Sequence, residues 1–325
     1  MATDPHRILL DRDLPSVLIK ENFADSLGLL EELVNYGSNL IPRCFISSEK
    51  KIPDIVVVLN FLKQGVSLMD SIHILVARGA TVACLILLRS LFEISIYLDW
   101  IFQKDSERRG TLYFVWDLRK KLYWARSMRK GTSEHEAHKI HMIGAPIGAV
   151  MPGLDESSID KTIETLRKLC ALPECTGVDS EFESYKNGLR DRDWYVPGGV
   201  NNFREMAKAV KREGEYKVFY SSFSAHTHGL SLDHQVAFPG DGKVNIEPIR
   251  NLNEIDTIFR NTFNFGINIY RTVLTRYRHG ELANFDRKYT NEWRKRFLSV
   301  KQIKRKDGGY TISNLTLPRR RGENL

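Results

Sequence analysis

Residues 68–102 read LMDSIHILVARGATVACLILLRSLFEISIYLDWIF, and this stretch decides the fold that the sequence predicts. Apolar residues occur all round the helix that it would form, which is typical of a helix buried on most sides. Between Arg78 and Asp99 only two full charges interrupt the apolar run, Arg89 and Glu93. They are spaced i,i+4 and lie side by side on one face, and a buried charge is costly unless it is paired. We therefore expect Arg89 and Glu93 to hold each other or to hold a ligand.

Helical periodicity recurs along the chain and strand signals are scarce, so we predict an all-α protein. The expected architecture is a helical bundle around a central buried helix, at about 68–102, with a basic C-terminal extension. Other helices are expected at 23–36, 55–64, 108–130, 134–142, about 155–172, 181–189, 203–211, 215–228, 252–278 and 281–300. Pro42 is expected in a loop, and residues 310–317 are expected to be extended. We divide the chain into an N-terminal helical segment (1–50), a helical core domain (51–282) and a basic C-terminal region (283–325).

The composition favours a cytoplasmic protein with no membrane contact. The N-terminal stretch MATDPHRILLDRDLP carries charges throughout and has no apolar segment of the signal-peptide type. The most apolar run, Ala80–Leu88, has nine residues, whereas a membrane span needs about 20. Four cysteines in a chain of 325 residues are typical of reduced thiols rather than of a disulfide framework.

The net charge of +8 is concentrated at the C-terminal end of the chain. Residues 285–325 contain twelve basic and four acidic residues, so the rest of the chain is formally neutral. A neutral body with a basic end indicates contact with a polyanion, and we expect RNA. A solvated tail with no ligand is the alternative. The residues expected to contact nucleic acid here are Arg294, Lys295, Arg296, Lys304, Arg305 and Lys306.

A polar stripe on the helix expected at 215–228 supplies the other half of the candidate site. Tyr216, Tyr220, Ser224 and His228 recur every four residues, so they share one face. If this face meets the central helix, Glu93 can accept a hydrogen bond from histidine, and Arg89 can neutralise an anion. The alternative is a satisfied buried network that holds two helices in register.

These residues also resemble a bacterial family of helical domains of unknown function. The resemblance covers about residues 60–280 and rests on an R-x-x-x-E helix, a tryptophan-bearing loop and a Y-x-x-x-Y-x-x-x-S-x-x-x-H helix. Those motifs place seven residues of this chain at family positions, which are Arg89, Glu93, Trp194, Tyr216, Tyr220, Ser224 and His228. The resemblance implies a helical bundle, and it also suggests kinship with the HEPN group of helical prokaryotic toxins and defence ribonucleases. The chain departs from that group because no R-x(4–6)-H motif precedes His228; one such match, Arg129 to His135, is a chance-level observation.

Metal and cofactor sites are not expected. The segment EHEAHKIH places His135, His138 and His141 close together, but HEAH is one residue short of the H-E-x-x-H spacing of zinc proteases. A solvated cluster is the favoured interpretation. The chain contains no P-loop, no dinucleotide-binding G-x-G-x-x-G and no G-x-S-x-G elbow.

The sequence therefore leads to two functional hypotheses. In the first, the protein is a metal-independent ribonuclease, a bacterial toxin or antiphage effector, in which His228 is the general acid or base and Arg89 stabilises the phosphorane. Glu93 orients either group, Tyr220 and Ser224 support them, and Trp194 contacts the nucleic acid. Whether His226 replaces His228 stays open, and such a toxin would have RNA, a second copy of itself, and an antitoxin or defence-system protein as partners. In the second hypothesis, the chain is a non-catalytic helical interaction module of such a system.

Overall fold

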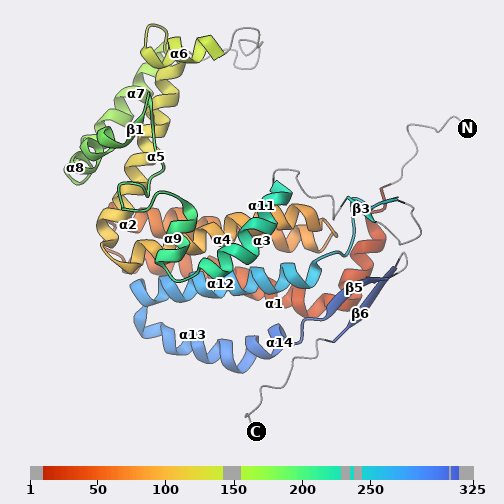
Figure 1. The fold of residues 1–325 in the computed structure, drawn as a ribbon. Coiled ribbons are helices and arrows are strands. Elements are labelled where there is room, and N and C mark those ends of the chain that lie inside the picture. The colour runs from red at the N-terminus through yellow and green to blue at the C-terminus, as the bar shows by residue number, and fades with distance from the viewer. Residues whose placement is uncertain (1–9, 142–154, 228–234, 238–243, 307–308, 315–325) are drawn as a thin grey trace, which may run out of the picture. The chain divides into compact units, whose positions relative to one another are not determined.

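The computed structural model describes residues 10–141, 155–227, 235–237, 244–306 and 309–314 (Figure 1). The predicted all-α class is confirmed, since the described strands form only three short antiparallel hairpins. The chain divides into two compact units. The first unit contains the described parts of Met1–Ser48, Val58–Asp99 and Arg212–Leu325, and the second contains Glu49–Val57 and Trp100–Lys211. These units cut across the three segments expected from the sequence, because helices from both ends of the chain pack into one bundle.

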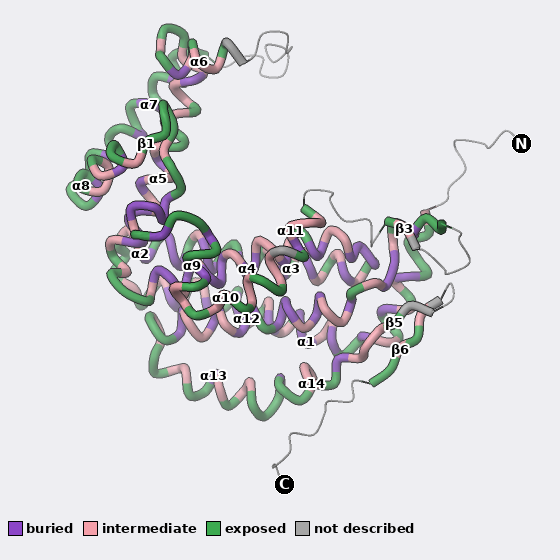
Figure 2. The backbone as a smooth tube through the Cα atoms, in the orientation of Figure 1, coloured by how far each residue is buried: buried purple, intermediate pink, exposed green. Residues whose placement is uncertain are grey.

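The first unit is a bundle of α1 (Asp13–Ser47), α3 (Lys63–Val76), α4 (Thr81–Gln103, as far as Asp99) and α12 (Ile255–Tyr277). Buried residues line these helices in Figure 2. The Tyr270 hydroxyl on α12 is fully buried and donates to the Leu33 carbonyl oxygen on α1 over 2.8 Å. Gly37 allows this approach, because a Cβ there would lie 2.0 Å from the Tyr270 hydroxyl. The long helix α12 therefore shares the centre of the bundle with the stretch singled out from the sequence.

That stretch is two helices rather than one, which corrects the prediction of a continuous helix at 68–102. The chain turns after α3 at Gly79, whose φ of +67° is favourable for glycine. The Ala80 amide donates to the Leu75 carbonyl oxygen over 3.0 Å, which satisfies a C-terminal carbonyl of α3. The Cys84 thiol then lies 3.8 Å from the Ile72 carbonyl oxygen, so α3 and α4 form an antiparallel hairpin.

Other elements complete the first unit. They are η1 (Ile55–Leu62, from Val58), α10 (Glu213–Glu215), η4 (Tyr216–Tyr220), α11 (Ser221–Thr227), the hairpin β3 (Val236–Ala237) with β4 (Asn245–Ile246), η5 (His279–Glu281), α13 (Leu282–Lys288), η6 (Tyr289–Trp293), α14 (Arg294–Leu298), and the hairpin β5 (Gln302–Lys306) with β6 (Gly309–Ser313). Residues 310–313 of the segment expected to be extended lie in β6, and residues 315–317 lie outside the described residues. Pro42, however, lies inside α1 rather than in a loop. It is exposed, so water can satisfy the carbonyl that a proline leaves without an amide partner.

The second unit is built on α5 (Ser106–Met128), which packs against α2 (Ile52–Asp54), α6 (Ser133–His141), α7 (Glu156–Cys170) and α8 (Pro173–Phe182). After α8 come η3 (Glu183–Tyr185), the hairpin β1 (Lys186–Asn187) with β2 (Arg190–Asp191), and α9 (Phe203–Ala209). The helix expected at 181–189 is therefore wrong. Asp155 caps α7 by accepting from the Ser157 amide, and Asn202 caps α9 by accepting from the Glu205 amide.

By length and composition alone, two helical stretches could cross a membrane, Ile52–Val76 and Thr81–Gln103. About half of each apolar window is buried inside the protein, 50% and 56% respectively. Core helices of soluble proteins pass the same test, so these stretches are weak evidence for a membrane. The cytoplasmic location stays a prediction.

Candidate functional site

The candidate site is a cluster around the Arg89 guanidinium on α4. Its Nε donates to Glu93 Oε1 over 3.1 Å, which confirms the expected contact of this pair. Its Nη2 donates to the Tyr220 hydroxyl over 2.7 Å, and its Nη1 donates to Ser224 Oγ over 3.3 Å. The helix α4 thus meets the polar stripe of η4 and α11, as the sequence predicts.

The backbone of η4 helps to bring Tyr220 to Arg89. Tyr216–Tyr220 is a π-helical turn, an uncommon element that frequently occurs at functional sites. Tyr216 stacks on Tyr220 with ring centroids 4.8 Å apart and an interplanar angle of 19°. Tyr216 therefore supports the ring that Arg89 contacts.

Burial changes the ionisation of this cluster. Burial raises the pKa of the Glu93 carboxyl above its ordinary value, and the charge and hydrogen bond of Arg89 offset only part of that rise. Burial, together with the nearby Glu93 carboxylate, also raises the pKa of the Tyr220 hydroxyl, against the opposing effect of Arg89. The pKa of Arg89 is raised, because Tyr220 and Glu93 outweigh the effect of its burial. Arg89 is therefore a permanent cation beside a phenol that keeps its proton at neutral pH.

A second polar cluster, which the sequence reasoning missed, fastens the same segment to α4. Arg212 pairs with Asp99 over 2.7 Å and with Glu215 over 2.6 Å, and it donates to Ser95 Oγ over 2.6 Å. Asp99 also accepts from the Thr272 hydroxyl over 3.0 Å. Asp99 is a charge within an apolar helix, which was a signal that it needs a partner, but nothing in the sequence pointed to Arg212.

The histidine of the candidate site lies at the edge of what the structure describes. His228 lies outside the described residues. His226 lies on α11, two positions earlier, and is half-buried. The choice between the two therefore stays open.

The structure separates the residues expected to contact nucleic acid. Trp194 is only 3% exposed, and its ring packs on Trp100 and Tyr113 in the second unit. Gly198 makes this packing possible, because a Cβ there would lie 2.3 Å from the Trp100 ring. Since a buried ring cannot stack on a base, we assign Trp194 to the core and correct its expected role.

Arg296 is likewise committed to the protein itself. It pairs with Asp25 over 2.7 Å and Glu32 over 2.6 Å, so it holds α14 against α1. Arg294, Lys295 and Lys304 are exposed, and the side chains of Arg305 and Lys306 lie outside the description. The exposed residues keep their predicted role in RNA binding.

Two histidines of α6, His135 and His138, contact other groups of the second unit, and the side chain of His141 lies outside the description. His135 Nδ1 lies 3.0 Å from the Ser127 carbonyl oxygen, and the His138 ring meets Trp124 edge-on, with centroids 5.7 Å apart. Within the part of the chain that the structure describes, no group of three histidine, cysteine, aspartate or glutamate residues could hold a metal ion.

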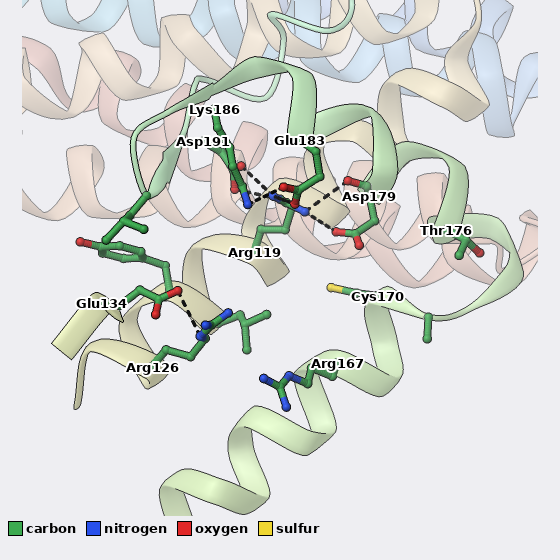
Figure 3. Close-up of a pocket in the computed structure, with 14 residues that line it drawn as sticks. Arg119, Arg126, Glu134, Arg167, Cys170, Thr176, Asp179, Glu183, Lys186 and Asp191 are labelled. Atoms are coloured by element: carbon green, nitrogen blue, oxygen red, sulfur yellow. Dashed lines mark hydrogen bonds and ion pairs between the residues drawn. The ribbon is translucent and has the colours of Figure 1, made fainter. Parts of the chain in front are cut away.

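The second unit holds a cavity of about 330 Å³ that the sequence did not indicate (Figure 3). Arg119, from α5, pairs there with Asp179, Glu183 and Asp191 over 2.6, 2.8 and 2.9 Å. These bonds raise the pKa of Arg119 despite its burial. Because three carboxylates surround one guanidinium, this network favours a structural role that joins α5 to α8 and the β1–β2 hairpin.

Residues 55–242 match the model of a family described as a family of unknown function, DUF5677. The matched span contains Arg89, Glu93, Tyr220 and Ser224 and stops before α12 and the basic C-terminal region. No curated protein and no solved structure matches the chain.

Proposed function

The chain belongs to DUF5677, a family of unknown function, through residues 55–242, and we propose that it is a metal-independent ribonuclease whose reaction site is the Arg89 cluster. The resemblance to helical domains of unknown function is thereby confirmed in its general form. The bacterial origin, the kinship with HEPN ribonucleases and the toxin or antiphage role are part of the proposal. They are supported by the motif resemblance alone.

One observation carries this proposal. The Arg89 guanidinium on α4 is held in place by Glu93 of the same helix and by Tyr220 and Ser224. Tyr220 and Ser224 belong to the segment that, in sequence, leads to His226 and His228. A fixed cation is suited to stabilise charge that develops in a transition state, because no reorganisation is needed when the reaction occurs. In the proposed reaction, the ribose 2′-oxygen attacks the neighbouring phosphorus and the bond to the 5′-oxygen of the next nucleotide breaks. A histidine, His226 or His228, takes the 2′-hydroxyl proton and passes it to the departing 5′-oxygen, and a 2′,3′-cyclic phosphate forms.

Arg89 would stabilise the added negative charge on the phosphorane oxygens. Glu93 would keep the guanidinium oriented through Nε, and Ser224 and Tyr220 would do so through the two terminal nitrogens. The π-helical turn at Tyr216–Tyr220 sets the position of the Tyr220 hydroxyl. These supporting residues act through Arg89 and are positioning residues in this scheme.

The second candidate function is a helical interaction module without catalysis. It is favoured by the fact that Arg89 and Arg212 both bind carboxylates and hydroxyls of the protein itself and fasten residues 212–224 to α4. In that case the cluster serves stability, and the basic end of the chain docks a partner.

Cleavage of a mixed RNA pool in excess EDTA tests the proposal. Wild type should cleave, whereas Arg89→Ala and the variant at the functional histidine, His226→Ala or His228→Ala, should not. Arg276→Ala is the matched control, since Arg276 is exposed on α12 and makes no ion pair within the described residues. Each variant is first shown to be folded by circular dichroism. Cleavage at the wild-type rate by Arg89→Ala would exclude the Arg89 cluster as the reaction site. If the folded wild-type protein cleaves no RNA, the ribonuclease proposal is wrong and the interaction module is favoured.

A further inference from the structure

The second unit carries an aromatic and basic hollow that the proposed reaction site does not use. One face of α5 presents Trp116, Lys120, Tyr123 and Trp124, which follow helical spacing. With Arg190 of β2, these residues line a hollow of about 230 Å³. The helix and the β1–β2 hairpin thus combine indole rings, a phenol and two flexible cations on one surface.

The cations of this hollow lie against aromatic faces rather than against carboxylates. Lys120 Nζ is 4.5 Å from the Trp116 ring centroid, and Arg190 Cζ is 5.2 Å from that of Tyr123. Both cations are exposed, and neither forms an ion pair among the residues that the structure describes. They are therefore available to an anionic ligand.

The two carboxylates of the hollow already have partners. Asp191 binds Arg119 over 2.9 Å, and Asp193 accepts from the Tyr195 hydroxyl over 2.7 Å. The neighbouring cavity around Arg119 differs, because it is lined by four cations and four carboxylates, and Arg167 alone among those cations forms no ion pair within the described residues. Of the two hollows, the aromatic one is thus the better anion site.

Trp124 supplies a stacking surface in this hollow. Its side chain is 43% exposed, which is a large exposed apolar area for a tryptophan. Tyr123 and His138 both meet it nearly edge-on, at 77° and 87°. Such aromatic rings bind unstacked bases in proteins that hold single strands, while nearby lysine and arginine bind the phosphates.

We propose that this hollow binds a nucleotide unit, with a base against Trp124 and Tyr123 and a phosphate against Lys120 and Arg190. The unit belongs either to a single strand of RNA or to a free nucleotide. A base within a duplex is already stacked and presents no open face, so duplex RNA is disfavoured. This inference goes beyond the proposed reaction and does not depend on it, because it concerns binding only.

Binding of a short labelled 2′-O-methyl RNA strand to the full chain in EDTA tests the proposal, since this strand cannot be cleaved through its 2′-oxygen. Trp124→Ala should weaken binding about 5-fold to 160-fold, the range for loss of one stacked base. Lys120→Ala and Arg190→Ala should each weaken binding and reduce the log–log salt slope by about 0.7. The control Lys121→Ala removes the same charge from α5 but should have little effect, because Lys121 pairs with Asp117 and lies outside the hollow.

Two further measurements complete the test. Thermal unfolding shows that each variant is folded, and quenching of tryptophan fluorescence by the strand should be smaller in Trp124→Phe than in wild type. Displacement of the strand by AMP assigns the site to free nucleotides, whereas displacement only by unlabelled strand assigns it to RNA. Equal binding by wild type, Trp124→Ala and Lys120→Ala, or equal binding of duplex and single strand in all variants, would overturn the proposal.

Discussion

Arg89 meets Tyr220 in two ways: its Nη2 donates to the hydroxyl over 2.7 Å, and its Cζ lies 4.6 Å from the ring centroid. One side chain of η4 thus offers the guanidinium both a hydrogen-bond acceptor and an aromatic face. A cation over a partly desolvated ring gains about 0.5–2 kcal/mol. This contact links the central helix α4 to the segment that leads to the candidate histidines.

The first prediction concerns the Arg89–Glu93 pair. Removing one partner leaves the other charge half-buried without its counter-charge, so Arg89→Met and Glu93→Gln should each destabilise the protein by about 2 kcal/mol. This is less than the 3–5 kcal/mol typical of a fully buried pair, because the two side chains are 18% and 25% exposed. The double variant should be more stable than the sum of the single losses predicts. Urea unfolding of the three variants measures the coupling, and strictly additive losses would contradict it.

The second prediction concerns Gly79. A Cβ at this position would lie 2.9 Å from Pro15 Cβ and 3.0 Å from the Asn251 carbonyl oxygen, and φ is +67°. Gly79→Ala should therefore destabilise the first unit by at least about 1–2 kcal/mol, the cost of a left-handed residue with a side chain. The control is Gly280→Ala, where a Cβ would meet nothing within 4 Å. If both variants have similar melting temperatures, position 79 does not require glycine, and the tight turn between α3 and α4 is contradicted.

The third prediction concerns the thiols of Cys44 and Cys84. Burial raises the pKa of each thiol to about 12, from an ordinary value near 9. The unfolded chain therefore ionises first, and stability is lost as the pH rises from about 9 towards 12. Between pH 8 and pH 10 each thiol should lower the free energy of unfolding by about 1.4 kcal/mol. Urea unfolding of wild type and Cys84→Ala at both pH values measures the difference, and an equal pH dependence would refute it.

The same burial predicts slow thiol chemistry. Native protein at pH 8 should react with iodoacetamide at Cys44 and Cys84 only as fast as it unfolds, because the thiolate is the reactive form. Mass spectrometry of native and urea-unfolded samples identifies the labelled residues. Rapid labelling of Cys84 in native protein would show that this thiol is accessible.

The fourth prediction separates two roles of basic residues near the C-terminal end. Arg296→Ala should destabilise the protein by about 1 kcal/mol, since it breaks ion pairs with Asp25 and Glu32. Lys295→Ala should leave stability unchanged, because Lys295 is exposed and makes no ion pair among the described residues. If the exposed basic residues bind RNA phosphates, Lys295→Ala and truncation after Val300 should weaken binding and flatten its salt dependence. If RNA binding is unchanged in both variants, the basic C-terminal region is a solvated extension that does not bind RNA.

The sequence predicted the parts of the site whose spacing is local. The i,i+4 relation of Arg89 and Glu93 within an apolar stretch indicated an ion pair, and the four-residue repeat from Tyr216 to Ser224 indicated a facing stripe. Gly79 could have indicated a turn, but apolar residues continue on both sides of it, so the sequence pattern predicted one continuous helix. Local pattern and tertiary structure agree where a charge in an apolar helix can be satisfied by only a few groups.

Contacts between distant positions could not be predicted in this way. Arg119 binds residues 60 to 72 positions away, and Arg212 binds Asp99 from 113 positions away. Their helices carry many other charges, so pattern alone does not pair them. The predicted role of Trp194 was wrong for a related reason, because an aromatic residue in a polar loop can pack on a core as readily as on a ligand. The local sign of the close approach of Trp100 was Gly198.

We propose that Arg89 acts in RNA cleavage and not only in packing, and the variant Arg89→Lys separates these two roles. Lysine keeps the positive charge but lacks the planar fork that reaches Glu93, Tyr220 and Ser224 together. The measurement is the single-turnover rate of RNA cleavage in EDTA, compared with the melting temperature of the same sample. If Arg89 stabilises the transition state, the rate should be at least about 100-fold below wild type, as for loss of one transition-state donor, in a variant that is still folded. A folded Arg89→Lys protein that cleaves RNA at the wild-type rate would show that the guanidinium has no part in catalysis.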